Sequence, residues 1–402
     1  MPPAHQPLAA PPRLLLLSAA VPETRLAGSL LLYRLLERYP ADRLLAVGPP
    51  PRAGSGVLQC EYRHLAPAPS GRFDLTRFAQ LKRSLESIGL LGRIPMRRID
   101  AAVGAFAADV VVSVMERRDY VDAAHRFCAA RRLPLVLIVH DRVESFDLVY
   151  PLFRRAQVAL NAASYRFASA RLCVSPEMAA SLEEIYGAPG TVLYPNRSET
   201  LTPRPVEDSV QLKAPGVLTL GYAGSLAYGY GHRIRQVMPA LASHGVRLRI
   251  YSRDAIAEPI AGTEHLGGFP TTDELWARVK QECDAVWLPY SHDAHFEPLY
   301  RTHFPSKLTE YMALGMPVLI SGPRYATGVR WGLAHPAAAV TIADDSLDDV
   351  RLAAGRLTND ATQRTTLARE SQGGDRDFDP IAVRERFMQV LAGVVHRPRE
   401  AA

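Results

Sequence analysis

The stretch from Phe304 to Gly322, FPSKLTEYMALGMPVLISG, contains both kinds of element that build an α/β fold. A short helical segment comes first, and proline suits the first turn of a helix, so we expect it to begin near Pro305 or Ser306. A Gly-Met-Pro break then leads into an apolar run that predicts a buried strand. The stretch therefore predicts a helix that feeds directly into a strand.

Similar apolar runs, separated by helical stretches, recur along the whole chain. Nearly continuous apolar strands that alternate with amphipathic helices are typical of a parallel sheet covered on both faces. The runs fall into two groups, and two α/β domains are also what a length of 402 residues predicts. The first group comprises residues 13–19, 43–47, 109–114, 134–140, 171–175 and 191–194, and the second comprises 217–224, 247–252, 284–290, 317–322 and 339–344.

The division between the domains is expected in a polar, proline-containing run without helical or strand periodicity, residues 196–216. We therefore assign residues 1–200 to an N-terminal domain, 201–216 to a linker and 217–379 to a C-terminal domain. The remaining residues, 380–402, contain a helix with apolar positions near one face, and we expect it to pack back on the N-terminal domain.

Composition is that of a globular protein, because 48% of the residues are hydrophobic and 22% are charged. The four cysteines are scattered without a close pair, which indicates neither a zinc site nor a disulfide framework and favours a cytoplasmic protein. Since no window approaches the roughly 18 apolar residues of a membrane span, membrane contact would be peripheral, at the inner face of the membrane.

Positive charge is concentrated in the first half of the chain. Residues 1–200 carry 25 Lys and Arg against 18 Asp and Glu, whereas the remainder carries 22 against 23. A basic half indicates an anionic partner, and the segments 76–98 and 153–155 suit an anionic membrane or glycan. The alternatives are a basic surface that serves solubility and, for 76–98, a helical pair that covers the sheet. Nucleic acid is not expected, because no recognition motif accompanies the charge.

The chemistry of the opening stretch is that of an anion site. Ligands of open parallel sheets bind beyond the carboxyl ends of the strands, and the strand 284–290 precedes this stretch. A helix that starts near Ser306 offers free N–H groups to a phosphate, and Lys307 adds a cation. Glu310 lies one turn further on the same face, where a carboxylate suits a pair of sugar hydroxyls. A surface Lys-Glu pair on an ordinary helix is the alternative.

Six segments, in this order along about residues 13–390, resemble the retaining glycosyltransferases of the GT-B fold, of the family 4 type. The resemblance implies an α/β fold with two Rossmann-like domains facing across a cleft, the second of which binds a nucleotide sugar. The segments are PETRLAGS (22–29), LIVHDR (137–142), CVSPEMAASLEEIYG with TVLYPN (173–196), LTLGYAGSLAYGYGHR (218–233), HLGGFPTTDELW (265–276) and PSKLTEYMALGMPVLISGP (305–323).

The resemblance assigns roles to single residues. Glu310 would hold the nucleotide ribose, His140 would contact the donor sugar or its phosphate, and Gly28 would leave room for the donor because it lacks a Cβ. The acid that the family carries eight positions before Glu310 is replaced by Thr302, and Glu297 is a candidate substitute. We therefore expect His140, Glu297 and Lys307 to be the catalytic residues.

Donor binding in the second domain departs from the family pattern of an arginine followed by a lysine after the glycine turn. After Gly224 this chain has Ser225, and His232 and Arg233 come later. We expect the diphosphate to be bound by the backbone of a helix that starts near His232, with Arg233 and Lys307 as cations. Donor-binding residues are then expected to be Gly28, Gly224, Ser225, His232, Arg233, Phe269, Pro270, Ser306, Lys307 and Glu310, with Phe269 and Pro270 beside the base.

The resemblance implies transfer of a sugar from a nucleotide diphosphate sugar to a glycan, lipid-linked or small-molecule acceptor, with retention at the anomeric carbon. No tightly bound cofactor and no metal is predicted. Catalysis would come from positioning and from stabilising charge on the departing diphosphate. A nucleotide-sugar epimerase of the same fold and a non-catalytic nucleotide-sugar-binding protein are the alternatives.

Overall fold

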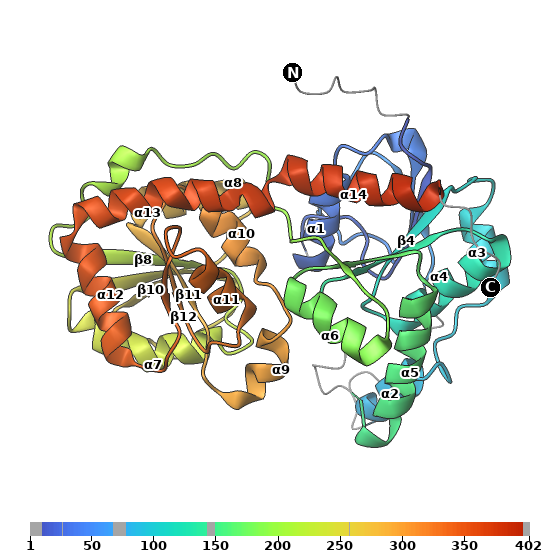
Figure 1. Ribbon diagram of the computed structural model, residues 1–402, viewed down its shortest axis with the longest axis horizontal. Helices are drawn as coiled ribbons and strands as arrows, with labels where there is room; N and C mark the ends of the chain where they lie inside the picture. Colours follow the sequence, from blue (N-terminus) through green and yellow to red (C-terminus); the bar gives the residue numbers. More distant parts are fainter. Residues whose placement is uncertain (1–9, 26, 67–77, 143–148, 257, 397–402) are drawn as a thin grey trace. The chain divides into compact units, whose positions relative to one another are not determined.

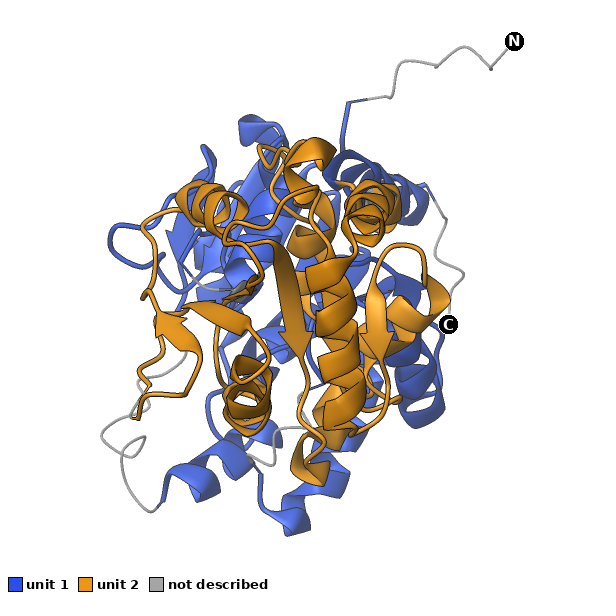
Figure 2. Cartoon of the chain, turned by 90° about the vertical axis from the view of Figure 1, so that its left-hand side faces the viewer, with its two compact units in different colours: residues 1–194, 380–402 blue, residues 195–379 orange. Residues whose placement is uncertain are grey.

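The computed structural model describes residues 10–25, 27–66, 78–142, 149–256 and 258–396. It divides into two compact units, coloured separately in Figure 2. Unit 1 comprises residues 1–194 and 380–402, and unit 2 comprises residues 195–379. In the described ranges, no helix is both long enough and apolar enough to cross a membrane.

Unit 1 is built on a parallel sheet of seven strands in the order β3-β2-β1-β4-β5-β6-β7 (Figure 1). Its strands are β1 (Leu14–Leu17), β2 (Leu44–Gly48), β3 (Glu61–His64), β4 (Val110–Val114), β5 (Leu135–Val139), β6 (Ala170–Cys173) and β7 (Thr191–Val192). Its helices are α1 (Ala27–Leu36), η1 (Ala41–Arg43), α2 (Ala79–Ser87), α3 (Met96–Val103), α4 (Arg118–Arg131), α5 (Pro151–Phe167), α6 (Pro176–Tyr186) and α14 (Pro380–Val395).

The last helix of the chain, α14, belongs to the core of unit 1. Val383, Phe387 and Leu391 are buried in the same hydrophobic cluster as strand residues of β1 and β4, and α14 lies against α1 (Figure 1). Ile381, at the start of the same helix, is 52% exposed. Strand residues alternate between the two faces, and α4 covers the other face through contacts with β1, β4 and β5.

Unit 2 repeats the design with six parallel strands in the order β10-β9-β8-β11-β12-β13. Its strands are β8 (Leu218–Ala223), β9 (Val246–Tyr251), β10 (Thr263–His265), β11 (Ala285–Pro289), β12 (Val318–Ser321) and β13 (Val340–Ile342). Its helices are η4 (Val206–Ser209), α7 (Tyr230–Ala242), α8 (Thr272–Glu282), η5 (Ala294–Phe296), α9 (Glu297–Tyr300), α10 (Ser306–Ala313), α11 (Thr327–Ala334), α12 (Leu347–Asn359), α13 (Ala361–Gly374) and η6 (Asp375–Phe378).

The prediction of two parallel α/β sheets is confirmed, and all eleven predicted strands are present. Two further strands, β3 and β10, were not predicted. Each lies at the edge of its sheet and none of its residues is buried, so neither shows an apolar run. Helix α10 begins at Ser306, as predicted. The stretch before it is not a plain loop, because η5 and α9 lie within it.

Residues 201–216 lie within unit 2 and are tied to it by buried arginines. Arg204 is 4% exposed and donates to the carbonyl of Cys283 at 2.9 Å and to the hydroxyl of Ser209 at 2.8 Å. Arg364 on α13 donates to the carbonyl oxygen of Ser209 at 2.9 Å. These hydrogen bonds hold the segment against the rest of unit 2, although its sequence lacks helical or strand periodicity.

Candidate functional site

The carboxyl edge of the unit 2 sheet gathers polar side chains around the start of α10. Lys307 occupies the first turn of this helix, directly beneath the glycine turn that follows β8. Gly224 has φ +117°, and a Cβ there would lie 2.6 Å from Cε of Lys307. Tyr311, one turn further along α10, accepts a hydrogen bond from the backbone N–H of Ala223 at 2.9 Å. The helix is thus fixed against the end of β8.

The Lys307 ammonium is held against aromatic faces. Its Nζ lies 4.1 Å from the ring centroid of Tyr230 and 5.5 Å from that of Tyr222, and both tyrosines are buried. Burial lowers the pKa of Lys307 to about 8, and the nearby carboxylate of Asp254 opposes this shift. The aromatic rings stabilise the charged ammonium less than water does. A phosphate beside Lys307 would stabilise the charged form further, because it carries negative charge.

Asp254, which the sequence analysis missed, shapes the glycine turn. One of its carboxylate oxygens accepts hydrogen bonds from the hydroxyl of Ser225 at 2.7 Å and from the N–H of Leu226 at 2.6 Å. The Ser225 hydrogen bond and the backbone hydrogen bonds lower the pKa of Asp254. The predicted ligand-binding hydroxyl of Ser225 is therefore engaged within the turn, where it also accepts from the N–H of Ala227 at 3.1 Å.

Glu310 is on the same helix as Lys307 and is only 5% exposed. Ser306, the first residue of α10, is partly exposed, so the first turn of the helix is reachable from solvent. Glu310 thus lies buried one turn behind a helix start that is partly exposed.

The start of α7 differs from the prediction. The helix begins at Tyr230, two residues before His232, and its N-cap is Gly229 with φ +85°. His232 is exposed, with its Nδ1 3.3 Å from the hydroxyl of Ser291. Arg233 is 2% exposed, and its Nη1 lies 2.5 Å from a carboxylate oxygen of Asp345. One nitrogen of Arg233 is therefore paired with a carboxylate, whereas its buried Nε and Nη2 have no hydrogen-bond partner among the described residues.

The turn before α7 is packed against α9. A Cβ at Gly229 would lie 2.6 Å from the hydroxyl of Tyr300, and this hydroxyl donates to the carbonyl of Tyr228. The rings of Tyr290 and Tyr300 meet edge to face, with centroids 4.8 Å apart. Aromatic side chains therefore pack around the turn that leads into α7.

Glu297 is the first residue of α9, and Thr302 follows the end of this helix. Glu297 is paired with Arg301, whose Nη2 lies 2.6 Å from its Oε1, and Arg301 lies over the ring of Tyr325 with its Cζ 4.9 Å from the centroid. Thr302 is 3% exposed. The candidate substitute acid is thus engaged in an ion pair one turn along its own helix.

The predicted base-binding loop follows β10 at the same edge. Phe269 is partly buried, with its ring centroid 5.8 Å from that of Tyr251, and its carbonyl accepts from Arg253 at 2.9 Å. Pro270 is exposed. Arg253 directly precedes Asp254, so this loop and the glycine turn are both attached to the segment that follows β9.

In unit 1, Gly28 and His140 also come together at the carboxyl edge. A Cβ at Gly28 would lie 3.8 Å from Nδ1 of His140, an ordinary contact, so the fold of this unit does not itself require a glycine there. Burial lowers the pKa of His140, against the effect of Asp141. Glu116, which follows β4 and was not predicted, has its pKa raised by burial and by Asp141.

A cavity of about 410 Å³ lies elsewhere in unit 2, near the amino ends of its strands. Its lining includes Thr219 at the start of β8, Arg247 at the start of β9 and Thr263 at the start of β10. No predicted site residue lines it. Within the described ranges, no group of three or more His, Cys, Asp or Glu side chains could hold a metal ion.

Comparison with known proteins places the fold. No protein-family model matches the sequence, and no curated protein matches it either. Among solved structures, HepE of Anabaena in complex with UDP is 16% identical, with a TM-score of 0.66 over 95% of this chain and 100% of that chain. Sucrose-phosphate synthase of Thermosynechococcus elongatus is 12% identical, with a TM-score of 0.67 over 95% and 98%.

A third similar structure is WaaG, a glycosyltransferase involved in lipopolysaccharide biosynthesis, which is 15% identical with a TM-score of 0.59 over 94% of this chain and 99% of that chain. These matches extend over nearly the full length of both partners. Together with the two parallel-sheet units, they show that the chain has the GT-B fold.

Proposed function

We propose that this protein is a glycosyltransferase that moves a sugar from a nucleotide diphosphate sugar to an acceptor, with retention at the anomeric carbon. The observation that carries the proposal is the start of α10, where Lys307 lies beneath Gly224 and Glu310 is buried one turn behind. Support also comes from HepE, a structural neighbour that was solved with UDP and with UDP-glucose.

In the proposed donor complex, unit 2 holds the nucleotide. The first turn of α10 and the Lys307 ammonium bind the diphosphate, and Glu310 accepts hydrogen bonds from the ribose hydroxyls. Phe269 and Pro270 lie beside the base. As the sugar leaves, negative charge grows on the diphosphate, and a cation that is already in position stabilises it without reorganisation.

Unit 1 contributes His140, which we propose contacts the donor sugar or its phosphate. Burial keeps this imidazole neutral to lower pH than usual, so that it can donate or accept a hydrogen bond at neutral pH without adding charge. The acceptor would be a glycan, a lipid-linked sugar or a small molecule, bound mostly by unit 1. A cytoplasmic location and participation in polysaccharide or glycoconjugate synthesis are part of this proposal.

A second candidate function, nucleotide-sugar binding without catalysis, is favoured by one feature. The acid expected at position 302 is a buried threonine, and the nearby Glu297 is occupied by Arg301. If the protein is a transferase, side chains other than an acid at position 302 must position the sugar.

The deciding experiment is a thermal-shift screen of the full chain against UDP, GDP, ADP and their sugars, followed by a transfer assay with the nucleotide sugar that binds. A ligand that binds only the folded state raises the unfolding temperature. We expect one nucleotide to do so and its sugar to be consumed when acceptor is present. Binding without consumption would favour the non-catalytic alternative, and consumption without acceptor to give an isomeric nucleotide sugar would favour the epimerase.

Glu310→Ala tests the ribose contact. We expect nucleotide affinity to fall by about tenfold to a hundredfold, since hydrogen bonds to a charged group are worth about 1.5–3 kcal/mol. Glu370→Ala is the matched control, because that residue is an exposed glutamate on α13. Calorimetry that gives equal affinities for wild type and Glu310→Ala would exclude the assigned role.

A further inference from the structure

A group of large apolar side chains is exposed on unit 1 around α2 and the start of α5. Leu152 is 85% exposed and Leu90 is 69% exposed, although both are leucines in a unit with a well-packed core. We call the whole group the α2–α5 face. It consists of Phe78, Leu81, Leu90, Leu91, Tyr150 and Leu152.

Helix α2 buries two serines and leaves a leucine exposed. Its buried residues are Ser84 and Ser87, whereas Leu81 is exposed. The hydroxyl of Ser87 donates to the carbonyl of Ser84 at 2.7 Å, and the hydroxyl of Ser84 accepts from the N–H of Tyr150 at 3.0 Å. An ordinary surface helix places its apolar side toward the core. Leu81 nevertheless remains 40% exposed, although it lies one turn before the buried Ser84, so α2 presents an apolar side chain at the surface.

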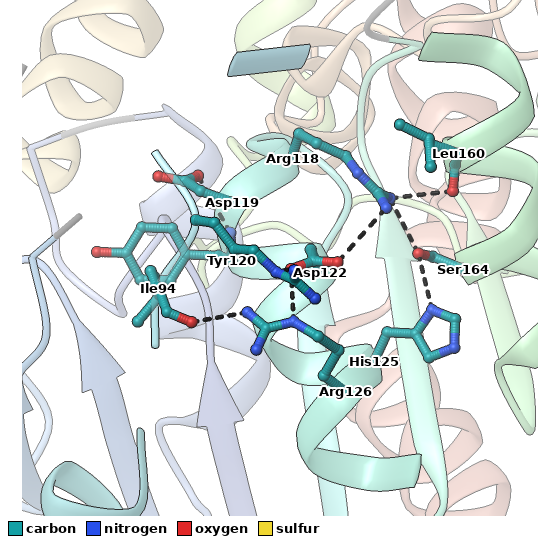
Figure 3. A network of polar contacts seen from close by, with 10 residues as sticks. Ile94, Arg118, Asp119, Tyr120, Asp122, His125, Arg126, Leu160 and Ser164 are labelled. Carbon is teal, nitrogen blue, oxygen red and sulfur yellow. Dashed lines mark hydrogen bonds and ion pairs between the residues drawn. The ribbon is translucent and has the colours of Figure 1, made fainter. Parts of the chain in front are cut away.

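The turn that follows α2 holds its leucines outward on an anchored backbone. The N–H of Leu90 donates to the carbonyl of Leu85 at 3.0 Å. Further along, the buried Ile94 is tied to α4, because Nη2 of Arg126 donates to its carbonyl at 2.7 Å while Nε of Arg126 is 2.7 Å from Asp122 (Figure 3). Leu90 and Leu91 are therefore presented by a fixed turn.

Basic residues outnumber acidic ones around this face. Residues 78–98 and 149–156 carry seven basic residues and one acidic residue, Glu86. Asp119 and Asp122 of α4 line the same pocket as Leu91, and Asp122 lies 3.6 Å from Nε of Arg93. Five of the seven are exposed, namely Arg83, Arg93, Arg97, Arg154 and Arg155. Arginine and lysine surrounding exposed leucine and aromatic side chains are complementary to an anionic bilayer, whose headgroups meet the cations while the acyl region takes up the apolar groups.

We propose that the α2–α5 face docks on the surface of an anionic phospholipid bilayer. The start of α5 follows β5 along the chain, so the face lies toward the same carboxyl edge of the unit 1 sheet as His140. Docking would bring a lipid-linked acceptor to that edge, a consequence that rests on the proposed glycosyl transfer. The docking itself does not depend on catalysis or on nucleotide.

Co-sedimentation of the full chain with vesicles tests the proposal. One set of vesicles contains equal parts of phosphatidylglycerol and phosphatidylcholine, and the other contains phosphatidylcholine alone. We expect binding to the anionic vesicles only, and weaker binding as salt is raised. The double variant Leu90→Ser with Leu152→Ser should bind about tenfold more weakly or worse, because two apolar side chains no longer enter the bilayer.

The matched control is Leu333→Ser with Leu352→Ser, two leucines of unit 2 that are 42% and 54% exposed. This control should sediment with the vesicles as the wild type does. Replacing Arg83 and Arg155 together by glutamine should reduce binding to anionic vesicles and flatten its salt dependence.

Three outcomes would overturn the proposal. The wild type could fail to sediment with anionic vesicles, or the Leu90→Ser, Leu152→Ser variant could sediment as well as the wild type. In the third, size-exclusion chromatography would show that the wild type self-associates through these leucines and does not bind vesicles, so that a second copy covers the face. Each outcome leaves the nucleotide screen unaffected, which separates this proposal from the proposed function.

Discussion

The starts of α7 and α10 contain the two cations that the sequence predicted for the diphosphate. The two side chains have different surroundings. Arg233, in α7, is buried and lies 2.5 Å from the carboxylate of Asp345. Lys307, in α10, is partly exposed and lies over the ring of Tyr230. We expect a cation that is paired with a carboxylate, even through one nitrogen, to attract a further anion less than a cation held by aromatic rings.

Replacing Lys307 should have the largest effect. We expect Lys307→Met to weaken nucleotide binding about a hundredfold, because a charge-assisted contact to phosphate is lost while the apolar stem is kept. Isothermal calorimetry measures this, and Lys280→Met on α8 is the matched control. A variant that binds as tightly as the wild type would show that the anion site lies elsewhere.

The pH dependence of binding should be the next largest effect. Burial lowers the pKa of Lys307 to about 8, so its ammonium is lost as the pH rises through that value. We expect affinity to fall by up to about tenfold per pH unit above pH 8, and Lys307→Met to lack this component.

Titration of Lys307 should also change the free energy of unfolding, which should rise with pH where the affinity falls. The pKa of Lys307 in the folded protein is below the ordinary value of 10.5, so the unfolded chain binds more protons between about pH 8 and pH 10.5. The contribution of this lysine to the free energy of unfolding should therefore rise with pH across that window. A difference in the pH profiles of wild type and Lys307→Met with the reverse slope would contradict the assigned burial.

Gly224→Ala tests whether the glycine turn keeps Lys307 in position. A Cβ would lie 2.6 Å from Cε of Lys307, and the lysine side chain is the part that can move. We expect nucleotide affinity to fall about tenfold, together with a loss of about 1–2 kcal/mol in the free energy of unfolding from the positive φ. Gly216→Ala shares a positive φ of +71° but meets nothing within 4 Å, so it should lose stability and keep affinity.

Arg233→Met should have the smallest effect on binding. We expect nucleotide affinity to stay within about twofold, while the free energy of unfolding falls by about 1–3 kcal/mol because a buried charged hydrogen bond is lost. Arg235→Met, on the exposed side of the same helix, is the control for stability. If Arg233→Met weakened binding as much as Lys307→Met, the distinction between the two helix starts would be wrong.

Much of the fold could be predicted from the sequence because buried parallel strands are apolar along their whole length. The strands that were missed, β3 and β10, are edge strands without a buried residue, and the short helix α9 lies in a stretch without a clear helical period. The apolar runs therefore revealed each sheet except for one of its two edge strands.

The candidate site was only partly accessible to sequence reasoning. Lys307 and Glu310 were found because they lie on one helix at a recognisable spacing after a strand. Asp254 was missed because it is a single carboxylate in an irregular segment, and its partner Ser225 is 29 positions away. Its only signal was its place shortly after a strand.

The sequence by itself determined the two groups of apolar strands. It also placed a helix start with a lysine after the third predicted strand of the C-terminal domain, residues 284–290. Only the tertiary structure decided which groups surround each cation. Arg233 and Asp345 are 112 positions apart, and Lys307 meets Tyr230 from another helix. The local pattern of side chains fixes secondary structure, but the solvation and pairing of a charge depend on groups that folding brings from distant parts of the chain.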